Sequence, residues 1–487
     1  MNSIDVEASS VVIGLRRLLD ATNVSTARAR KAVQELTAIT DDGEAMALAA
    51  RFAPTANLSS DALVKLWPTT ADPDAFAATL LAPALRREGV HSLRLRRMTS
   101  LTGLRHLTML SSLQLVQCKE MTDLTEVGAL TDLTFLSLES CPGVADLTPL
   151  STLTRLTRLA LSWCRAVTDV TPLLSLSRLV RLDIEASGIS SVAGFGAAFP
   201  ALETLGLRGN RQLEDVAPLS GLTGLTGLDL GNTGIHDLAG LRDLPSLTEL
   251  DLRECAQLRS LDGIDALDGL TEVTLLKCTR LTTLRGFGSH PGLKALSLSE
   301  CPRLSDLRGI SSLTHLTWLG LYRNKRLTSL ADAGSLPRLS SVGIHDCPEV
   351  KDLSELTGLS TLTTLGVRAA HWFRDLTPFT GLENLRELRI GDNDALADLT
   401  GVENLPRLTT LEVACCPKLS TLGALDGLPG LSELDLQHCP ALTDSRFLLD
   451  MPSLQRALLP SHLFTAASDG STDPVVAELR ARGVTAF

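Results

Sequence analysis

Hydrophobic residues recur along most of this chain in one fixed pattern, in which leucine-type positions are separated by short runs of polar or small residues. Segments with the pattern L-x-x-L-x-L-x-x-C/N begin at 15 leucines from Leu110 to Leu431, spaced by 23 residues except for one step of 22 between Leu225 and Leu247. A less regular copy begins at Val90, and a decayed copy begins at Leu454. So constant a period predicts a solenoid, in which each repeat stacks on the one before it.

The residue pattern within each repeat predicts one short strand with a single buried face. In the copy that reads LTFLSLESCPGVADLTPL, Leu136 and Leu138 alternate with Ser137. Strict alternation indicates a half-buried strand, and one repeat cannot bury that face without its neighbours. The pair Thr148–Pro149, with its counterparts at 171–172 and 377–378, predicts an N-cap and the first residue of a short helical turn. We interpret Asp146, which precedes the first of these pairs, as a loop cap.

Over roughly residues 90 to 460 these motifs resemble the leucine-rich repeat family. The second half of each repeat is similar to the short bacterial repeats of the internalin type, but has one extra residue after the Cys/Asn position. The resemblance implies an α/β solenoid of about sixteen repeats. It would be a curved leucine-rich-repeat horseshoe with a concave parallel β-sheet, short 3₁₀ or helical turns on the convex side and an N-terminal α-helical cap.

The two ends of the chain lack the repeat. Residues 1–89 carry apolar stripes at helical spacing, such as Ala29, Val33 and Leu36, and predict a helical N-terminal capping domain. Residues 90–460 form the predicted solenoid. Residues 461–487 predict a C-terminal cap, with a small-polar loop at 466–472, a short helix that opens at Pro474 and a last strand at 483–487. Solenoids need such caps because their terminal repeats expose an apolar edge.

Composition excludes several classes of protein. The net charge is −11 and aromatic residues are only 3% of the chain. Nucleic-acid binders generally have the opposite charge and use aromatic platforms, so we expect no nucleic-acid partner. No run of apolar residues approaches the ~18 that a membrane span needs, and the first residues do not read as a secretory signal. The sequence therefore predicts a cytoplasmic protein without a membrane partner, and it gives no evidence for an obligate oligomer.

The cysteines occupy one repeated position. Nine of the ten fall on the Cys/Asn slot that closes the turn after each strand, and no C-x-x-C motif is present. We interpret them as buried structural side chains, and we expect no cofactor. Cys415 is the one cysteine outside this slot. With Asp392 and His438, at equivalent positions in adjacent repeats, it makes a weak candidate for a metal site, although the expectation is that no metal is bound.

The candidate binding surface comes from the polar positions of successive strands, which become columns across the sheet. Three successive glycines hold the central position, which predicts a bare floor that a partner approaches closely. Large aromatic and charged residues flank it, a composition typical of interface hot spots. The predicted partner-binding residues are Trp318, Gly320, Tyr322, Arg323, Gly343, His345, Asp346, Gly366 and Arg368.

An acidic stretch is a second feature of the predicted surface, and its members are Asp183, Glu185, Asp229, Glu249, Asp251, Glu254 and Glu272. The interpretations open for it are a solvated face and a site for a basic partner. Two interpretations are likewise open for the three glycines. They either form a surface on which a partner docks, or they have no function and Trp318 simply packs on its neighbours.

The sequence favours a non-enzymatic recognition scaffold that binds a macromolecule, expected to be a protein, on its concave sheet. It contains no Gly-Lys dipeptide, hence no Walker A loop, and no H-E-x-x-H motif. Two alternatives remain. The N-terminal helices followed by repeats resemble the sensing half of bacterial NACHT-type NTPases, which implies a sensor or regulatory component. An enzymatic activity hidden in the N-terminal helical region is the other alternative, although this region contains neither Cys nor His.

Overall fold

The computed structural model describes residues 12–17, 24–39, 43–423, 425, 428–443, 445–463 and 474–486. They divide into two compact units, residues 1–212 and residues 213–487. The loop expected at 466–472 lies outside the described residues. In the part of the chain that is described, no helix has the length and apolar character needed to cross a membrane.

The first unit begins with helices that do not follow the repeat. The predicted stripe is confirmed, because Ala29, Val33 and Leu36 are buried along one helix. Ser25 caps the start of that helix by accepting the Arg28 N–H. The helices are α2 (Thr26–Thr37), α3 (Gly43–Ala56), α4 (Ser60–Leu66), α5 (Pro73–Phe76) and α6 (Ala82–Glu88), with a π-helical turn at Ala77–Leu81 between the last two.

Parallel strands follow these helices in the first unit. They pair in chain order, so that Leu113 aligns with Leu136 and Leu136 aligns with Leu159 in the next strand. The strands of this unit are β1 (Ser92–Arg96), β2 (Ser112–Val116), β3 (Phe135–Glu139), β4 (Arg158–Ser162), β5 (Arg181–Glu185) and β6 (Thr204–Gly206).

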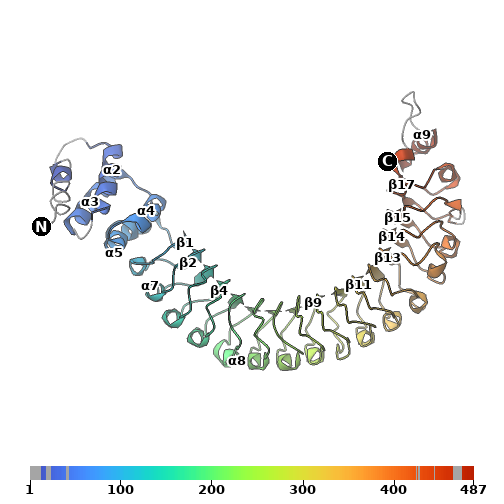
Figure 1. Ribbon diagram of the computed structural model, residues 1–487, viewed down its shortest axis with the longest axis horizontal. Helices are drawn as coiled ribbons and strands as arrows, with labels where there is room; N and C mark the ends of the chain where they lie inside the picture. The colour runs from blue at the N-terminus through green and yellow to red at the C-terminus, as the bar shows by residue number, and fades with distance from the viewer. Residues whose placement is uncertain are drawn as a thin grey trace. The chain divides into compact units, whose positions relative to one another are not determined.

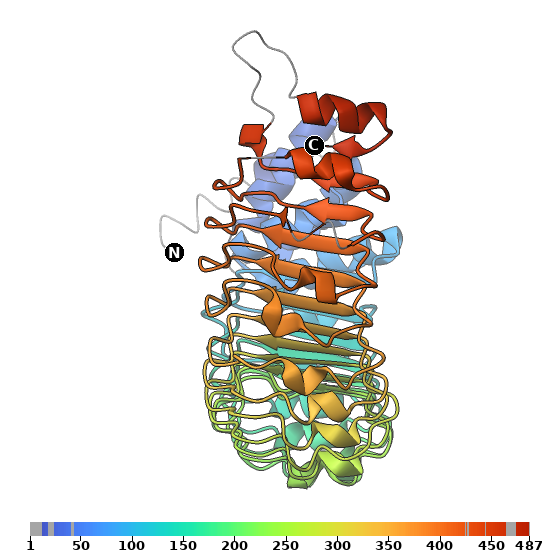
Figure 2. The ribbon, with the colours of Figure 1, turned by 90° about the vertical axis from the view of Figure 1, so that its right-hand side faces the viewer.

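The second unit continues the same construction. Its first strands are β7 (Gly227–Asp229), β8 (Glu249–Asp251), β9 (Glu272–Leu276), β10 (Ala295–Ser299), β11 (Trp318–Tyr322) and β12 (Ser341–His345). Its later strands are β13 (Thr364–Arg368), β14 (Glu387–Gly391), β15 (Thr410–Ala414), β16 (Glu433–Asp435), β17 (Arg456–Leu458) and β18 (Thr485–Ala486). Figure 2 shows the strands near the C-terminus lying side by side.

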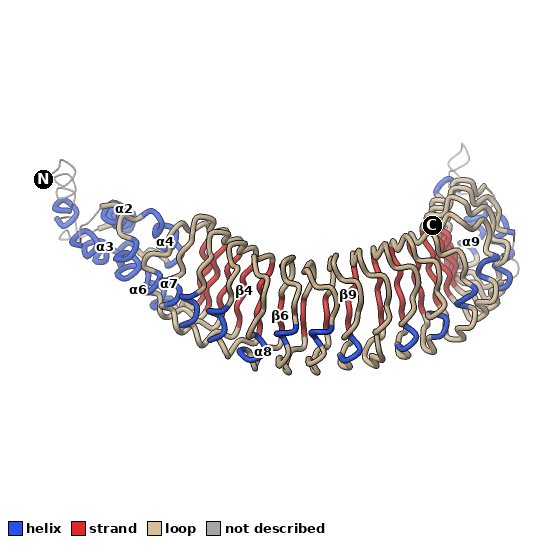
Figure 3. The backbone as a smooth tube through the Cα atoms, turned by 60° about the horizontal axis from the view of Figure 1, so that its bottom comes forward, coloured by secondary structure: helices blue, strands red, loops and turns tan. Residues whose placement is uncertain are grey.

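Within each unit the strands lie on the inner side of the bend and the short helical turns lie on the outer side (Figure 1). Strand, loop and short helical turn alternate in most repeats (Figure 3), although the described residues between β9 and β10 form no helical turn. The turns are mostly 3₁₀ helices of three to five residues, such as Thr148–Thr152, with α7 (Thr125–Gly128) and α8 (Phe195–Ala198) as short α-helices. The predicted α/β solenoid with a parallel sheet and short outer turns is therefore confirmed.

The core of each repeat is the set of leucines that the period singles out. Leu136 and Leu138 have no exposed surface, and Leu133 is equally buried behind them. Complete burial of one such side chain is worth about 1.5–3 kcal/mol before entropic costs. Because the same burial recurs in repeat after repeat, stacking is what stabilises the solenoid.

In the repeats that carry the Thr-Pro pair, the preceding aspartate caps the outer turn and the threonine does not. The Asp146 carboxylate accepts the backbone N–H of Thr148 at 2.8 Å, and Asp169 accepts that of Thr171 at 2.9 Å. The interpretation of Asp146 as a loop cap is thus confirmed. The threonine is the first helical residue rather than the N-cap, because the Asp side chain already satisfies its N–H.

The residue that directly follows most strands has a left-handed backbone, which the sequence did not predict. Its N–H still extends the ladder, as when Gln117 N donates to Glu139 O at 2.8 Å. The non-glycine residues in this left-handed column have φ between 46° and 62°; they are Arg97, Gln117, Ser140, Trp163, Ala186, Asn232, Glu254, Lys277, Glu300, Arg323, Asp346, Ala369, Asp392, Cys415 and His438.

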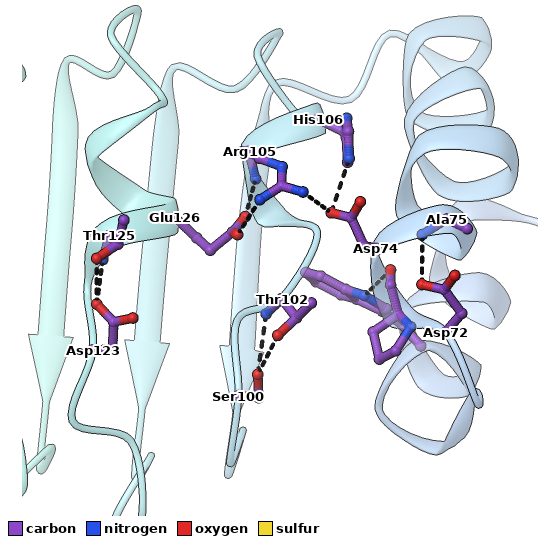
Figure 4. Close-up of polar contacts among 12 residues, drawn as sticks. Asp72, Asp74, Ala75, Ser100, Thr102, Arg105, His106, Asp123, Thr125 and Glu126 are labelled. Atoms are coloured by element: carbon purple, nitrogen blue, oxygen red, sulfur yellow. Dashed lines mark hydrogen bonds and ion pairs between the residues drawn. The ribbon is translucent and has the colours of Figure 1, made fainter. Parts of the chain in front are cut away.

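The N-terminal helices contact the first repeats through one tight approach and a small polar network (Figure 4). The Asp74 carboxylate of α5 lies 2.9 Å from the Arg105 guanidinium and 3.0 Å from His106 Nε2. Arg105 also pairs with Glu126 of α7 at 3.0 Å. A methyl group on Gly103 would stand 2.6 Å from the Pro73 carbonyl oxygen, so the helix packs directly against this glycine.

The far end of the second unit matches the predicted elements. Helix α9 (Pro474–Ala481) precedes β18, which pairs with β17, so that the last regular repeat is followed by one further strand. An added strand satisfies the backbone groups that an edge would leave open. The proposed division into a cap at 1–89, a solenoid at 90–460 and a cap at 461–487 remains a prediction.

Candidate functional site

The predicted binding residues gather on strands β11, β12 and β13 of the second unit. Parallel register places Gly320 beside Gly343, and Gly343 beside Gly366, along the centre of these strands. Side chains at alternate positions of a strand share one face. The first position of each strand therefore makes one flank (Trp318, Ser341, Thr364) and the fifth makes the other (Tyr322, His345, Arg368).

Of the three central glycines, two leave the strand surface open and one does not. A methyl group on Gly366 would meet nothing within 4 Å, and one on Gly343 would meet only the Tyr322 hydroxyl at 3.7 Å. At Gly320 the same methyl would clash with the Trp318 ring and would stand 2.6 Å from the Tyr322 ring. The expectation of a bare floor at Gly320 is therefore corrected, because the two aromatic rings close over this glycine and bury it.

Two of the aromatic side chains beside Gly320 and Gly343 are in ring contact. Tyr322 meets His345 edge-on, with ring centroids 6.2 Å apart and planes at 72°. Such edge-to-face pairs are favourable beyond the area they bury. Trp318 and Tyr322 both keep part of their surface exposed, so the floor at Gly343 begins beside a partly exposed aromatic pair.

The predicted charged residues are held by ion pairs around this surface. Arg323 reaches Glu300 at 3.2 Å, and Lys325 reaches Asp346 at 2.6 Å. Arg323 and Asp346 belong to the left-handed column, so they lie just past the ends of their strands. The remaining predicted cation, Arg368, pairs with Glu412, which is two strands further along the sheet.

A charged hollow adjoins the floor, and the sequence analysis did not assign it. It has a volume of about 200 Å³ and is lined by Glu387, Arg389, Thr410, Leu411, Glu412, Glu433, Leu434, Asp435, Arg456 and Leu458. Arg389 pairs with Glu387 and, at 3.7 Å, with Glu412. A sequence signal existed, because Arg389, Glu412 and Asp435 continue the central column that holds the glycines.

The acidic stretch is divided between the two units. Asp183 and Glu185 lie on β5 in the first unit, and the other five residues belong to the second. Register places Glu249 beside Glu272, so like charges are adjacent there. Asp251 is engaged locally, because it accepts the Arg253 N–H at 2.9 Å and pairs with the guanidinium of the same residue. The choice between a solvated face and a basic-partner site stays open.

The cysteine slot has the predicted structural role. All nine slot cysteines are buried and none is paired in a disulfide, whereas Cys415 is half-buried. Their thiols donate to nearby carbonyls, as Cys255 Sγ does to Leu230 O at 3.1 Å. Asn210 Nδ2 makes the equivalent contact with Ile184 O at 2.6 Å, which explains why Cys and Asn alternate at this position. Burial raises the pKa of Cys255 and of Cys347 to about 11.

Asp392, Cys415 and His438 share the left-handed column, as their equivalent positions predict. Burial, and then the nearby Asp392 carboxylate, raise the pKa of the Cys415 thiol, which is the opposite of what a metal-binding thiolate needs. Across the residues that the structure describes, no group of three or more His, Cys, Asp or Glu side chains is arranged to hold a metal ion.

The repeats themselves define the class of the protein. Residues 223–267 match the family model for leucine-rich repeats, which spans two copies of the repeat. Together with the strand register of both units, this match confirms that the chain resembles the leucine-rich repeat family in its repeats and in its fold. No curated protein matches it.

Among solved structures, the chain is similar to an internalin from Listeria monocytogenes, at 20% identity and a TM-score of 0.40 over 82% of this chain and 93% of that one. It is also similar to a leucine-rich repeat protein from Leptospira interrogans, at 19% identity and a TM-score of 0.45 over 79% and 91% of the two chains. A third similar structure is the functional domain of InlJ from Listeria monocytogenes, which includes a cysteine ladder; it matches at 18% identity and a TM-score of 0.40 over 81% and 77%.

Proposed function

We propose that this chain is a non-enzymatic recognition scaffold that binds a partner protein on the inner strand face of its second unit. Leucine-rich repeat solenoids generally act as protein-interaction scaffolds, because their stacked strands present one long, solvent-facing surface. The proposed docking site, here called the glycine floor, consists of Gly343 and Gly366 with Trp318, Tyr322 and His345 beside them.

One observation carries this proposal. At Gly343 and Gly366 the strand surface is clear of side chains, and it lies directly beside partly exposed aromatic rings. Glycine weakens a strand unless something gains from close access to the backbone. Aromatic anchors next to a surface that a partner can approach closely are typical of interface hot spots.

Two further observations support a binding role rather than catalysis. Nine of the ten thiols are buried in turns, which removes them as nucleophiles. The charged residues near the glycine floor are engaged in ion pairs, such as Lys325 with Asp346, which suits a fixed recognition surface. The cytoplasmic location, the sensor role beside a NACHT-type NTPase and the alternative of an N-terminal enzymatic activity stay predictions from the sequence.

The test begins with affinity capture of a partner by the full chain, followed by measurement of binding by variants. Gly343→Arg places a long charged side chain on the floor, in a position with room for its first atom. Gly358→Arg is the matched control, because Gly358 is exposed, has equally open space and lies in a turn away from the strands. Both should move stability by about 0.5 kcal/mol or less, as surface substitutions usually do.

The proposal expects Gly343→Arg to abolish capture and Gly358→Arg to leave it intact. Truncation of Trp318 or Tyr322 to alanine should weaken binding by about 2 kcal/mol or more if they are anchors. Asp229→Arg tests the competing acidic surface. If Gly343→Arg and Trp318→Ala bind like the unmodified chain while Asp229→Arg fails, the site belongs to the acidic stretch and the proposal is wrong.

A further inference from the structure

Trp163 is an unusual residue on the first unit, far along the chain from the glycine floor. It follows β4, its side chain is 52% exposed, and its backbone has φ of 61°. The left-handed backbone is shared by the whole column, so it does not by itself distinguish Trp163. Its neighbours in the left-handed column of this unit, Gln117, Ser140 and Ala186, are smaller, so the column itself does not require an indole.

The exposed indole contacts a neighbouring cation. The Arg165 guanidinium carbon lies 5.8 Å from the centroid of the Trp163 ring, within the range of a cation–π contact. Among the described residues, Ile13 and Trp163 are the large apolar side chains with the most exposure. An exposed aromatic side chain has few rotatable bonds, so it can contribute contact area to a partner at little entropic cost.

A basic hollow lies on the same edge of the sheet, two repeats earlier in the stack. It has a volume of about 360 Å³ and is lined by Arg97, Met98, Thr99, Gln117, Lys119 and Glu120. Arg97 Nε donates to Gln117 Oε1 at 3.5 Å, and both Arg97 and Lys119 are exposed. Neither cation forms an ion pair with any residue that the structure describes, whereas the cations beside the glycine floor do.

Backbone hydrogen bonds fix the spacing between the hollow and the indole. Gln117 N donates to Glu139 O and Ser140 N donates to Ser162 O, both at 2.8 Å, so successive residues of the column stay one strand apart. At about 4.8 Å per strand, Trp163 lies roughly 10 Å from Gln117 along the stack. An extended segment covers this distance with about three residues.

We propose that this edge, the Trp163 edge (Arg97, Gln117, Lys119, Trp163 and Arg165), is a second docking surface that binds an extended acidic peptide segment with one large apolar residue. The apolar residue would pack on the exposed face of the indole. Carboxylates of the segment would meet Arg97 and Lys119 in the hollow. In a chain of net charge −11, two exposed cations without ion-pair partners single out an anionic ligand locally.

The cations of this edge outnumber the acids that line the hollow. Arg97 and Lys119 stand against Glu120 alone. Two further acids lie along this edge: Glu139, whose carboxylate is 3.8 Å from Arg94, and Glu185, whose backbone carbonyl accepts the Trp163 N–H. The carboxylates of an acidic segment would therefore be attracted to the hollow, and its apolar residue rather than a carboxylate would lie at Trp163, beside Glu185. Nucleic acid is disfavoured by the chain's overall negative charge, which repels a polyanion at longer range.

The test uses the full chain and a fluorescein-labelled synthetic peptide in which one central leucine is flanked by glutamates, with binding followed by fluorescence anisotropy. The peptide should bind at low ionic strength and weaken as salt is added, because exposed charges are screened. Trp163→Gly should weaken binding about tenfold or more if the indole is an anchor. Glycine is chosen because it adopts the backbone at this position without strain, so the loss would not come from misfolding.

Matched variants make the outcome decisive. Lys119→Glu should weaken binding of the acidic peptide. Arg338→Glu, which reverses an exposed charge in the second unit, should leave binding unchanged. Ser140→Gly, in the same left-handed column, should also bind like the unmodified chain. Gly343→Arg should leave peptide binding unchanged, which separates this surface from the glycine floor. Failure of the acidic peptide to bind, tighter binding of a lysine–leucine peptide, full binding by Trp163→Gly, or equal binding of a single-stranded oligonucleotide would each overturn the proposal.

Discussion

At the scale of single residues, the turn after each strand shows how one position accepts chemically different side chains. Cysteine and asparagine both place a donor against a carbonyl of the preceding repeat, at 3.1 Å from Cys255 Sγ to Leu230 O and at 2.8 Å from Asn324 Nδ2 to Leu298 O. The requirement is a small buried donor, because an unpaired buried carbonyl costs free energy. Reactive thiol chemistry is not part of that requirement.

The slot cysteines are therefore expected to be inert in the native protein. A bulky thiol reagent should label Cys415 first, because it is the half-buried cysteine, and should label the others only after denaturation. Because the Asp392 carboxylate helps to raise the pKa of Cys415, Asp392→Asn should make this labelling faster. Mass spectrometry after timed quenching would measure both rates. Rapid labelling of several slot cysteines in the folded state would show that the structural interpretation is wrong.

His290 is a buried polar residue at a core position that leucines occupy in the adjacent repeats. Its Nδ1 lies 3.0 Å from the Leu267 carbonyl oxygen, and its ring meets Phe287 edge-on at 5.7 Å. Nε2 is buried without a hydrogen-bond partner. Burial lowers the pKa of this imidazole below its ordinary value of 6.5, despite Asp268 and Asp265 nearby.

The lowered pKa of His290 gives a stability prediction with a definite sign. The unfolded chain binds a proton near pH 6.5, whereas the folded chain resists it, so stability is lost as the pH falls below that value. His290→Leu should remove this loss and add about 1–3 kcal/mol, since it eliminates the unpaired nitrogen. Urea unfolding above and below pH 6.5 would measure the difference, with the exposed His371→Leu as control. A pH dependence that persists unchanged in His290→Leu contradicts the assignment.

At the scale of elements, the join between α5 and the first repeats depends on close packing more than on charge. Gly103 has φ of 90°, and a methyl group there would stand 2.6 Å from the Pro73 carbonyl oxygen and 2.8 Å from Ala77 Cβ. The Asp74 pairs nearby are partly exposed, and such ion pairs contribute about 0–1 kcal/mol.

Gly103→Ala should therefore destabilise the chain by about 1–3 kcal/mol through strain and overpacking. Asp74→Asn should cost less than about 1 kcal/mol. Gly366→Ala is the control for the chemical change, because its added methyl meets nothing within 4 Å. Urea denaturation of the three variants gives the comparison. If Asp74→Asn proves more damaging than Gly103→Ala, charge rather than packing joins these elements.

The outer turns show which element details the sequence could predict. The 23-residue period and its leucines were sufficient for the strands, since apolar burial alone fixes their register. The short turn at Thr148 was predicted at the right place and Asp146 was interpreted as a loop cap. The N-cap was assigned to Thr148 although it is the first helical residue, because only the backbone geometry distinguishes these two positions. The left-handed column escaped prediction, because it holds ordinary residues such as Gln117 and Ser140 rather than glycine.

The candidate site was predictable in its columns but not in its side-chain directions. Parallel register follows from the period, so Gly343 and Gly366 could be placed side by side from sequence. Two features depend on side-chain rotamers, which one sequence does not specify. They are the position of the rings that cover Gly320 and the direction of Arg368, which reaches Glu412. The exposure of Trp163 was not predicted, because it depends on the left-handed backbone, which the sequence does not indicate.

At the scale of the whole molecule, the helices at 26–88 belong to the same compact unit as the first repeats. Removal of residues 1–89 would expose Leu104 and the unpaired edge of β1, and an open edge invites aggregation. We expect the fragment 90–487 to aggregate or to lose soluble expression, as gel filtration would show. A soluble, monomeric fragment with cooperative unfolding would instead identify the N-terminal region as an independent domain.

The most direct test of the binding role is site-specific photocross-linking to a captured partner. A photoreactive amino acid at Ser341, on the flank of the glycine floor, should cross-link the partner, and Gly343→Arg in the same chain should eliminate that product. The same amino acid at Arg338, outside the strands, should give none. Cross-links at Arg338 or at Asp229 without any at Ser341 would contradict the assignment of the partner to the inner face of β11–β13.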